Sequence, residues 1–198
     1  MNWIFNFPFK LNIDVALIDR TVKNFSVQFS GFFNIIKNIL NGLIGGILTI
    51  LNFIPWWVLV LFVFLAGWKL TGKLRNGILY SCMLFFIGII GLWDLMNDTL
   101  SIVLAAVFIS LLLGFPIGIL ISGNDKINGF VRPILDTMQT MPVFVYLIPA
   151  VLFFGLGKAP AVIATTIYAI VPVIRLTSHG IRQVDKEVVE AARAFGST

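Results

Sequence analysis

The chain has 198 residues, of which 59% are hydrophobic and 12% charged, and its mean hydropathy is +0.99. This composition lies outside that of soluble globular proteins and predicts an all-α polytopic membrane protein. The net charge of +5 is spread beside apolar segments rather than gathered in one patch. The basic residues therefore indicate membrane topology and argue against nucleic-acid binding.

The first part of the chain differs from the rest. Residues 1–31 mix aromatic and charged side chains, so we expect them at a membrane surface, without an assigned function. Polar or small residues recur every three or four positions from Asn34 to Asn52, which predicts an amphipathic helix. It could lie in the interface or cross the bilayer, and we favour the interface. We therefore divide the chain into an interfacial, amphipathic scaffold region, 1–53, and a transmembrane domain, 54–198.

Five more apolar segments are predicted to span the membrane. Several are shorter than the roughly 20 residues that a perpendicular helix needs, so tilt or flanking residues must contribute. The segments are Ile54–Trp68, Gly77–Leu92, Leu100–Ile121, Met141–Leu156 and Ala159–Leu176.

The charges between these segments predict the topology. The loop at 69–75 is basic and the one at 94–98 is acidic, so the first should be cytoplasmic and the second external. Alternation then places residues 185–198 in the cytoplasm, and Lys158 is the one external basic residue. No Asp, Glu, Lys or Arg lies in the middle of a predicted span, which argues for energy supplied from outside the bilayer.

Two proline-containing segments are candidates for moving or pathway-lining elements. Gly114-Phe-Pro-Ile-Gly118 combines a helix-kinking proline with two small residues, which suits either a hinge or close helix packing. In 138–149, two prolines predict irregular backbone, which membranes tolerate only where it is buried in protein or lines a cavity. Its aromatic rings could contact a quaternary ammonium by cation–π attraction, although packing or interfacial anchoring is the alternative role. The candidate pathway residues are Met138, Gln139, Met141, Pro142, Phe144, Tyr146 and Pro149.

The last fourteen residues predict a short, soluble-looking helix. Asp185 can cap its start, and Gly196 lies where a left-handed residue would end it. One face carries a narrow apolar stripe made of Val188, Ala191, Ala192 and Phe195. Such a stripe suits docking into a groove of another protein, and a solvated loop helix is the alternative.

Chemistry-bearing residues are sparse. His179 lies in a predicted cytoplasmic loop without acidic or cysteine neighbours at metal-binding spacing, and Cys82, the only cysteine, lies in an apolar run. The pattern GxxxxGK[ST] of a phosphate-binding loop is missing from the sequence. We therefore expect no catalytic residues, no metal site and no ATP site in this chain.

Two motifs resemble a known family. Glu190-Ala-Ala192 followed by Gly196 resembles the cytoplasmic coupling loop of ABC importer permeases, and 135–149 closely resembles permeases for glycine betaine and related quaternary-ammonium osmoprotectants. The resemblance implies a type I ABC importer permease-like helix bundle. The family pattern continues beyond the glycine while this sequence ends at Thr198, so we expect the last helices to be lacking.

The resemblance also implies a function: a permease subunit that couples ATPase motion to alternating access for glycine betaine or related solutes. It is not itself an enzyme, and ATP and Mg²⁺ belong to the partner. The implied partners are ABC ATPase subunits, a second permease copy, an extracytoplasmic substrate-binding protein or domain, and membrane lipid, at the plasma membrane of a bacterium. The implied ATPase-coupling residues are Glu190, Ala191, Ala192, Phe195 and Gly196. An ABC permease for another small solute such as an amino acid, or a non-ABC membrane scaffold or channel-like subunit, is the alternative.

Overall fold

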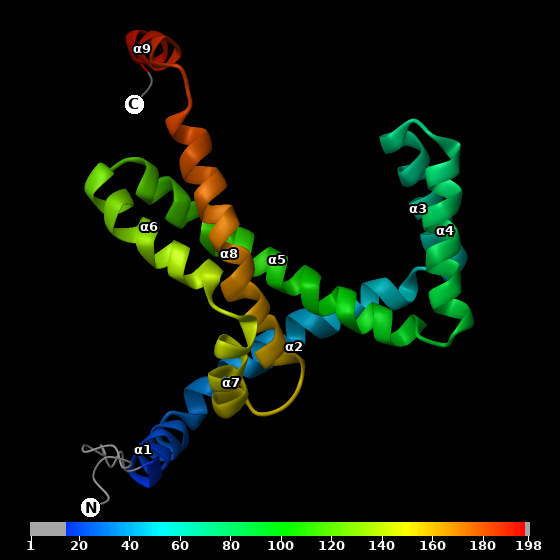
Figure 1. The fold of residues 1–198 in the computed structure, drawn as a ribbon, viewed down its shortest axis with the longest axis horizontal. Coiled ribbons are helices and arrows are strands. Elements are labelled where there is room, and N and C mark those ends of the chain that lie inside the picture. Colours follow the sequence, from blue (N-terminus) through cyan, green and yellow to red (C-terminus); the bar gives the residue numbers. More distant parts are fainter. Residues whose placement is uncertain (1–14, 197–198) are drawn as a thin grey trace, which may run out of the picture.

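The computed structural model describes residues 15–196, which form nine helices and no strands (Figure 1). The helices are α1 (Val15–Gln28), α2 (Ser30–Phe53), α3 (Trp56–Thr71), α4 (Leu74–Ile89), α5 (Trp93–Ser122), α6 (Asp125–Thr140), α7 (Val143–Phe154), α8 (Lys158–Arg182) and α9 (Lys186–Ala194). The predicted all-α class is confirmed for this part of the chain.

The centre of the structure is the pair α5 and α8, which make the most extensive helix contact. A ridge of buried, mostly small residues recurs every four or five positions along α5: Asn97, Ser101, Ala105, Ser110, Gly114 and Gly118. Small residues on such a ridge let two helix backbones approach closely in a membrane protein. Close packing of α5 on α8 therefore depends on glycines and on residues with short side chains.

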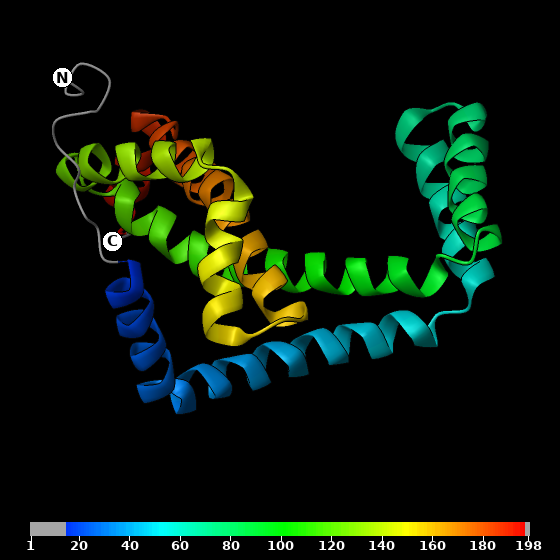
Figure 2. The same cartoon turned by 60° about the horizontal axis from the view of Figure 1, so that its bottom comes forward.

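The glycines of the segment at 114–118 serve this packing. A Cβ added at Gly118 would lie 2.6 Å from Cβ of Thr177, and one at Gly114 would lie 2.8 Å from Cγ1 of Val173. Close packing, one of the two interpretations left open by the sequence, is thus confirmed. The helix remains continuous through Pro116, and Figure 2 shows α5 changing direction in its second half, as expected where a proline removes a helical hydrogen bond.

The N-terminal helices support this pair from one side. α2 lies along α5 (Figure 2), and its Leu40 and Ile44 are buried with Ala105 and Val162. At the other end of α2, Phe33 stacks on Phe153 of α7, with ring centroids 4.9 Å apart. Phe25 of α1, in the segment 1–31 to which we could assign no function, lies edge-on to the same Phe153 ring with centroids 6.0 Å apart, so both α1 and α2 contact α7.

Helices α3 and α4 form a hairpin that stands away from the rest of the bundle (Figures 1 and 2). The two helices touch through glycines, because a Cβ at Gly77 would lie 2.7 Å from the carbonyl oxygen of Phe64 and one at Gly67 would lie 2.8 Å from Cδ2 of Tyr80. The hairpin's contact with α5 is small. It is therefore a unit held mainly by its own packing.

Helix lengths correct the predicted spans. Among the described residues, α2, α5 and α8 are long and apolar enough to cross a membrane, and the bent pair α6–α7 adds a fourth candidate. The predicted span 141–156 is wrong as a single crossing, since α7 has only 12 residues and joins α6 at an angle of 88°. α5 begins at Trp93 rather than Leu100, and α8 continues to Arg182, so that His179 lies in a helix and not in a loop.

The α3 and α4 helices have 16 residues each, close to the predicted spans 54–68 and 77–92. α2 covers the predicted amphipathic helix and ends at Phe53, next to the proposed boundary of the scaffold region. The interfacial placement of that region stays a prediction, and its residues 1–14 lie outside the described part of the chain.

Candidate coupling helix and pathway segment

The capped C-terminal helix forms as expected. The Oδ1 atom of Asp185 accepts a hydrogen bond from the backbone N–H of Glu187 at 3.1 Å, satisfying one of the free donors of the first turn. At the other end, Gly196 has φ +87°, the left-handed conformation that favours glycine. Both ends of α9 are therefore fixed by residues that the sequence identified.

The apolar stripe of α9 has no partner within the described chain. Phe195 is 94% exposed and Val188 is 61% exposed, and Glu190, Ala191 and Ala192 are also exposed. No other described helix packs extensively on α9, which stands apart at the end of α8 (Figure 1). An exposed aromatic beside small residues is the surface expected of a helix that docks into a groove elsewhere.

The pathway segment contains the predicted irregular backbone. α6 ends at Thr140, Met141 is extended (φ −73°, ψ 135°), and Pro142 precedes α7. A residue before proline is disfavoured in the helical conformation, which explains the extended Met141. The 88° bend between α6 and α7 therefore follows from local sequence.

Tyr146 stabilises this bend. In a continuous helix the carbonyl of Met138 would accept the N–H of residue 142, but Pro142 has none. Instead, the hydroxyl of Tyr146 donates a hydrogen bond to the Met138 carbonyl at 2.8 Å. The sequence singled out Tyr146 for its aromatic face, and the structure shows a second role for its hydroxyl.

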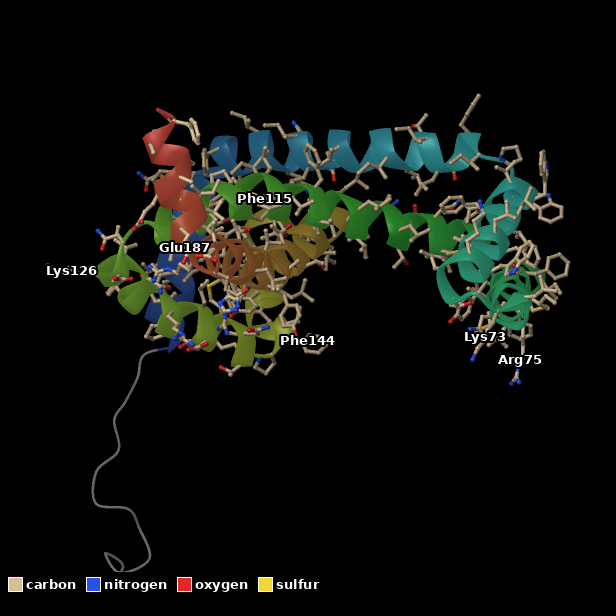
Figure 3. The ribbon with its side chains drawn as sticks, turned by 90° about the horizontal axis from the view of Figure 1, so that it is seen from above. Lys73, Arg75, Phe115, Lys126, Phe144 and Glu187 are labelled. Atoms are coloured by element: carbon tan, nitrogen blue, oxygen red, sulfur yellow. The ribbon has the colours of Figure 1, made fainter. Side chains whose placement is uncertain are left out.

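The structure brings only some pathway candidates together. Met138 and Tyr146 meet at the bend, and Met141 beside them is partly buried. Phe144 is 73% exposed and lies at the edge of the helices in Figure 3. Three further candidates are exposed: Gln139, Pro142 and Pro149. Lining of a pathway by these residues stays a prediction.

Two ion pairs tie α6 to α8, and the sequence did not reveal them. Arg182 contacts Asp125 at 2.6 Å, and Arg175, about two turns earlier in α8, pairs with Asp136. Arg175, near the inner end of the last predicted span, therefore has a carboxylate partner on the neighbouring helix. The sequence does show opposite charges on the two helices. However, the paired residues are 57 and 39 positions apart, so the sequence alone does not indicate which charges meet.

A basic cavity lies beside these ion pairs. It has a volume of about 420 Å³ and opens between α5, α6 and α8. Its polar lining consists of Arg132, Arg175, His179, Arg182, Asn128 and Ser178. The cavity lies at the end of α8 that leads into α9, so the region next to the candidate coupling helix carries a net positive charge.

Charges at the other end of α8 explain the one exception to the predicted topology. Lys158, the lone basic residue on the predicted external side, pairs at 2.6 Å with Asp98, which the sequence placed in an acidic loop and which lies in the second turn of α5. In Figure 2 the α3–α4 turn, the α5–α6 turn and α9 lie on one side of the molecule, and the α7–α8 turn lies on the other. This arrangement agrees with the predicted alternation of loops.

Side-chain sticks show how the basic residues are distributed. Lys73 and Arg75 lie at the tip of the α3–α4 hairpin, far from Lys126 and Glu187 at the opposite end of the molecule (Figure 3).

Among the described residues no cluster of three or more His, Cys, Asp or Glu side chains could hold a metal ion. The structure thus defines a multi-pass, all-helical membrane protein with an exposed, capped helix after its last apolar span.

The C-terminal part of the chain matches a known family. Residues 110–198, a little under half of the chain, match the family described as binding-protein-dependent transport system inner membrane component. The matched region contains the end of α5 and all of α6 to α9, and therefore both candidate sites.

Curated relatives agree along most of the chain. It is 45% identical over 183 residues to the glycine betaine transport system permease protein OpuAB of Bacillus subtilis, and 42% identical over 188 residues to the glycine betaine/carnitine transport permease protein GbuB of Listeria monocytogenes. It is 38% identical over 181 residues to the glycine betaine/proline betaine transport system permease protein ProW of Escherichia coli. These alignments cover 92%, 91% and 91% of this chain, and the chain spans 64%, 65% and 50% of the respective relatives.

The comparisons confirm the resemblance to betaine permeases and a multi-pass location in the plasma membrane. The roles of the individual coupling and pathway residues stay predictions.

Proposed function

We propose that this chain is the membrane permease part of an ATP-driven ABC importer for glycine betaine or related quaternary-ammonium osmoprotectants. The observation that carries the proposal is α9. It is capped at both ends, presents Glu190-Ala-Ala192 and Phe195 to solvent, and occurs in a chain 38–45% identical to three permeases named for glycine betaine transport. Such a helix suits docking into a cytoplasmic ATPase subunit.

The contacts of α8 support a mechanical role for α9. α9 follows α8 after a short link, α8 packs tightly on α5 through Gly114 and Gly118, and two ion pairs connect α8 to α6. A displacement of α9 would therefore move α8, α5 and α6 together. The bend before α7 is the place where this motion would reach the pathway segment, giving alternating access.

Nucleotide chemistry belongs to the partner in this proposal. ATP and Mg²⁺ would bind the ATPase subunits, since the chain itself lacks a phosphate-binding loop pattern. A second permease copy would complete the pathway, and an extracytoplasmic binding protein or domain would deliver the solute. The aromatic faces of Phe144 and Tyr146 could contact a passing quaternary ammonium weakly, at roughly 0.5–2 kcal/mol each.

The test is Gly196→Arg in the full-length protein in its native membrane, with Gly72→Arg as matched control. Both glycines have positive φ (87° and 66°) and nothing within 4 Å of an added Cβ, so both variants should suffer a similar backbone penalty and gain the same charge. We expect Gly196→Arg to reduce ATPase co-purification and betaine uptake at least about tenfold, a loss of ~1.4 kcal/mol in docking. Gly72→Arg should retain both.

Expression and membrane insertion should be equal in the two variants. Unchanged ATPase recovery and uptake in Gly196→Arg would show that α9 is not the coupling element. If the unmodified protein binds the ATPase but takes up another solute instead of betaine, the proposed substrate is wrong and the proposed coupling role of α9 still stands.

A further inference from the structure

A second cavity, distant from the coupling helix and the pathway segment, lies at the base of the α3–α4 hairpin. It has a volume of about 630 Å³ and is formed where the end of α2, the start of α3, the end of α4 and the start of α5 converge. It lies towards the predicted external side, opposite α9. Neither the proposed transport function nor the coupling helix uses it.

Aromatic rings from three helices line this cavity. Trp56 is the first residue of α3, Trp93 is the first residue of α5, and Phe85 comes from α4. The rings of Trp56 and Phe85 are tilted at 45° with centroids 6.3 Å apart. Aromatic faces attract cations, and tryptophan does so most strongly.

The cavity also contains an acid without a cationic partner. Asp94 lines it in the first turn of α5, and among the described residues it forms no ion pair. One turn later, Asp98 is neutralised by Lys158. The two neighbouring carboxylates thus differ: one is paired within the chain, and the other leaves its charge at the aromatic cavity.

A buried amide in the wall has an unused acceptor. Asn97 is 2% exposed, and its Nδ2 donates to Oδ1 of Asn52 at 3.0 Å, while its own Oδ1 is buried without a hydrogen-bond partner. Buried polar atoms in folded proteins are nearly always satisfied, so an unsatisfied one calls for an explanation. A ligand with an N–H group would supply the missing donor.

We propose that this cavity binds a primary ammonium group, held by the faces of Trp56 and Trp93, the carboxylate of Asp94 and the amide oxygen of Asn97. A primary ammonium satisfies all three kinds of group, since it is a cation and has three N–H donors. A quaternary ammonium would satisfy the rings and the carboxylate but leave Asn97 unpaired. The ammonium can come from a phosphatidylethanolamine headgroup in the external leaflet or from a soluble amine.

The experiment measures binding to the full-length protein in nanodiscs of phosphatidylglycerol. Short-chain phosphatidylethanolamine, short-chain phosphatidylcholine and free ethanolamine are titrated separately, and binding is read by native mass spectrometry and by tryptophan fluorescence. We expect phosphatidylethanolamine to bind saturably and more tightly than phosphatidylcholine. Competition by millimolar ethanolamine would identify a soluble amine as a sufficient ligand, and lack of competition would identify the lipid headgroup; both outcomes support the ammonium site.

Matched variants locate the site. Trp56→Leu should weaken binding roughly three- to thirtyfold, whereas Trp57→Leu, at the adjacent and equally exposed tryptophan outside the cavity lining, should leave it unchanged. Asp94→Asn should weaken it about two- to fivefold, and Asp98→Asn should have no effect. Each variant is checked for an unchanged unfolding midpoint.

Equal binding of phosphatidylethanolamine and phosphatidylcholine, or binding that is insensitive to both Trp56→Leu and Asp94→Asn, would overturn the proposal. Failure of transport or of ATPase docking would not bear on it, because neither measurement involves this cavity.

Discussion

Pro116 in the α5–α8 pair and Pro142 between α6 and α7 have opposite effects on the helix, although Pro133 and Pro149 lie inside α6 and α7 without breaking them. Pro116 lies inside an uninterrupted 30-residue helix, while Pro142 lies at an 88° break. Around Pro116, glycines let α8 press against the helix, so tertiary packing holds it together. At Pro142, the carbonyl left without a backbone partner is satisfied by a side chain, the hydroxyl of Tyr146.

The two prolines differ in their surroundings. Each removes one backbone hydrogen bond, but the helix continues at Pro116, where α8 packs closely, and breaks at Pro142, where the Tyr146 hydroxyl satisfies the free carbonyl. The stability of the α5–α8 pair should therefore depend on side-chain volume at its glycines, and the stability of the α6–α7 bend should depend on the hydroxyl of Tyr146.

The largest effect should come from adding a methyl group to the packed pair. Gly118→Ala places a Cβ 2.6 Å from Thr177 and 3.0 Å from the Ile174 carbonyl oxygen, so the helices must separate. We expect a loss of about 1–3 kcal/mol in the free energy of unfolding. The measurement is the unfolding midpoint in detergent.

Gly129→Ala in α6 is the matched control, because nothing lies within 4 Å of its added Cβ. There the helical preference of alanine over glycine should stabilise the protein by about 0.5–1 kcal/mol. The two substitutions should thus have opposite signs. A rise in midpoint for both would mean that α5 and α8 are not in close contact at Gly118.

An intermediate effect is expected at the bend. Tyr146→Phe removes the hydroxyl that donates to the Met138 carbonyl but keeps the aromatic face. We expect a loss of about 1 kcal/mol in stability, the usual contribution of one hydrogen bond, together with faster hydrogen exchange around residues 138–146. Tyr168→Phe, at a tyrosine of α8 whose hydroxyl forms no hydrogen bond within the described residues, should change neither.

Tyr146→Ala separates the two possible roles of this side chain. If only the hydroxyl matters, the Phe and Ala variants should slow betaine uptake equally. If the ring also contacts the cation, uptake should fall further in Tyr146→Ala than in Tyr146→Phe. Unchanged exchange in Tyr146→Phe would contradict the role of the hydroxyl in holding the bend.

Local signals in the sequence predicted α9 and the irregular backbone within 138–149, because a cap, a left-handed glycine and a proline act within a few residues of themselves, but they did not predict the 88° bend between two helices. Hydropathy predicted the presence of α5 and α8 but not their ends. α5 starts seven residues before Leu100 because Asp94, Asn97 and Asp98 are polar yet helical, and α8 runs past Leu176 with basic residues that favour a helix C-terminus.

Contacts between distant segments were not predictable from one sequence. The pairing of Arg182 with Asp125 and of Asn97 with Asn52 depends on the registers of helices joined by turns whose geometry the residues alone do not specify. The small-residue ridge of α5 was visible in the sequence, but we interpreted only its last two members, Gly114 and Gly118. The rest were harder to identify, because the spacing changes from four to five residues between Ala105 and Ser110 and because Asn97 lies before the predicted apolar segment.

The smallest effect is expected at the ion pair between Lys158 of α8 and Asp98 of α5, where the two helices are joined by opposite charges rather than by close packing. Lys158 and Asp98 are each more than one-third exposed, so their ion pair should contribute at most about 0.2–1 kcal/mol. A double-mutant cycle with Lys158→Ala and Asp98→Ala should give a coupling free energy in this range that shrinks as salt rises from 0.05 to about 0.5 M. Lys126→Ala, at an exposed lysine without an ion pair, is the control for loss of one positive charge. A coupling free energy that salt does not reduce would show that the Lys158–Asp98 pair is shielded from water. The end of the α5–α8 pair next to the turn at Gly155–Gly157 would then be packed rather than exposed.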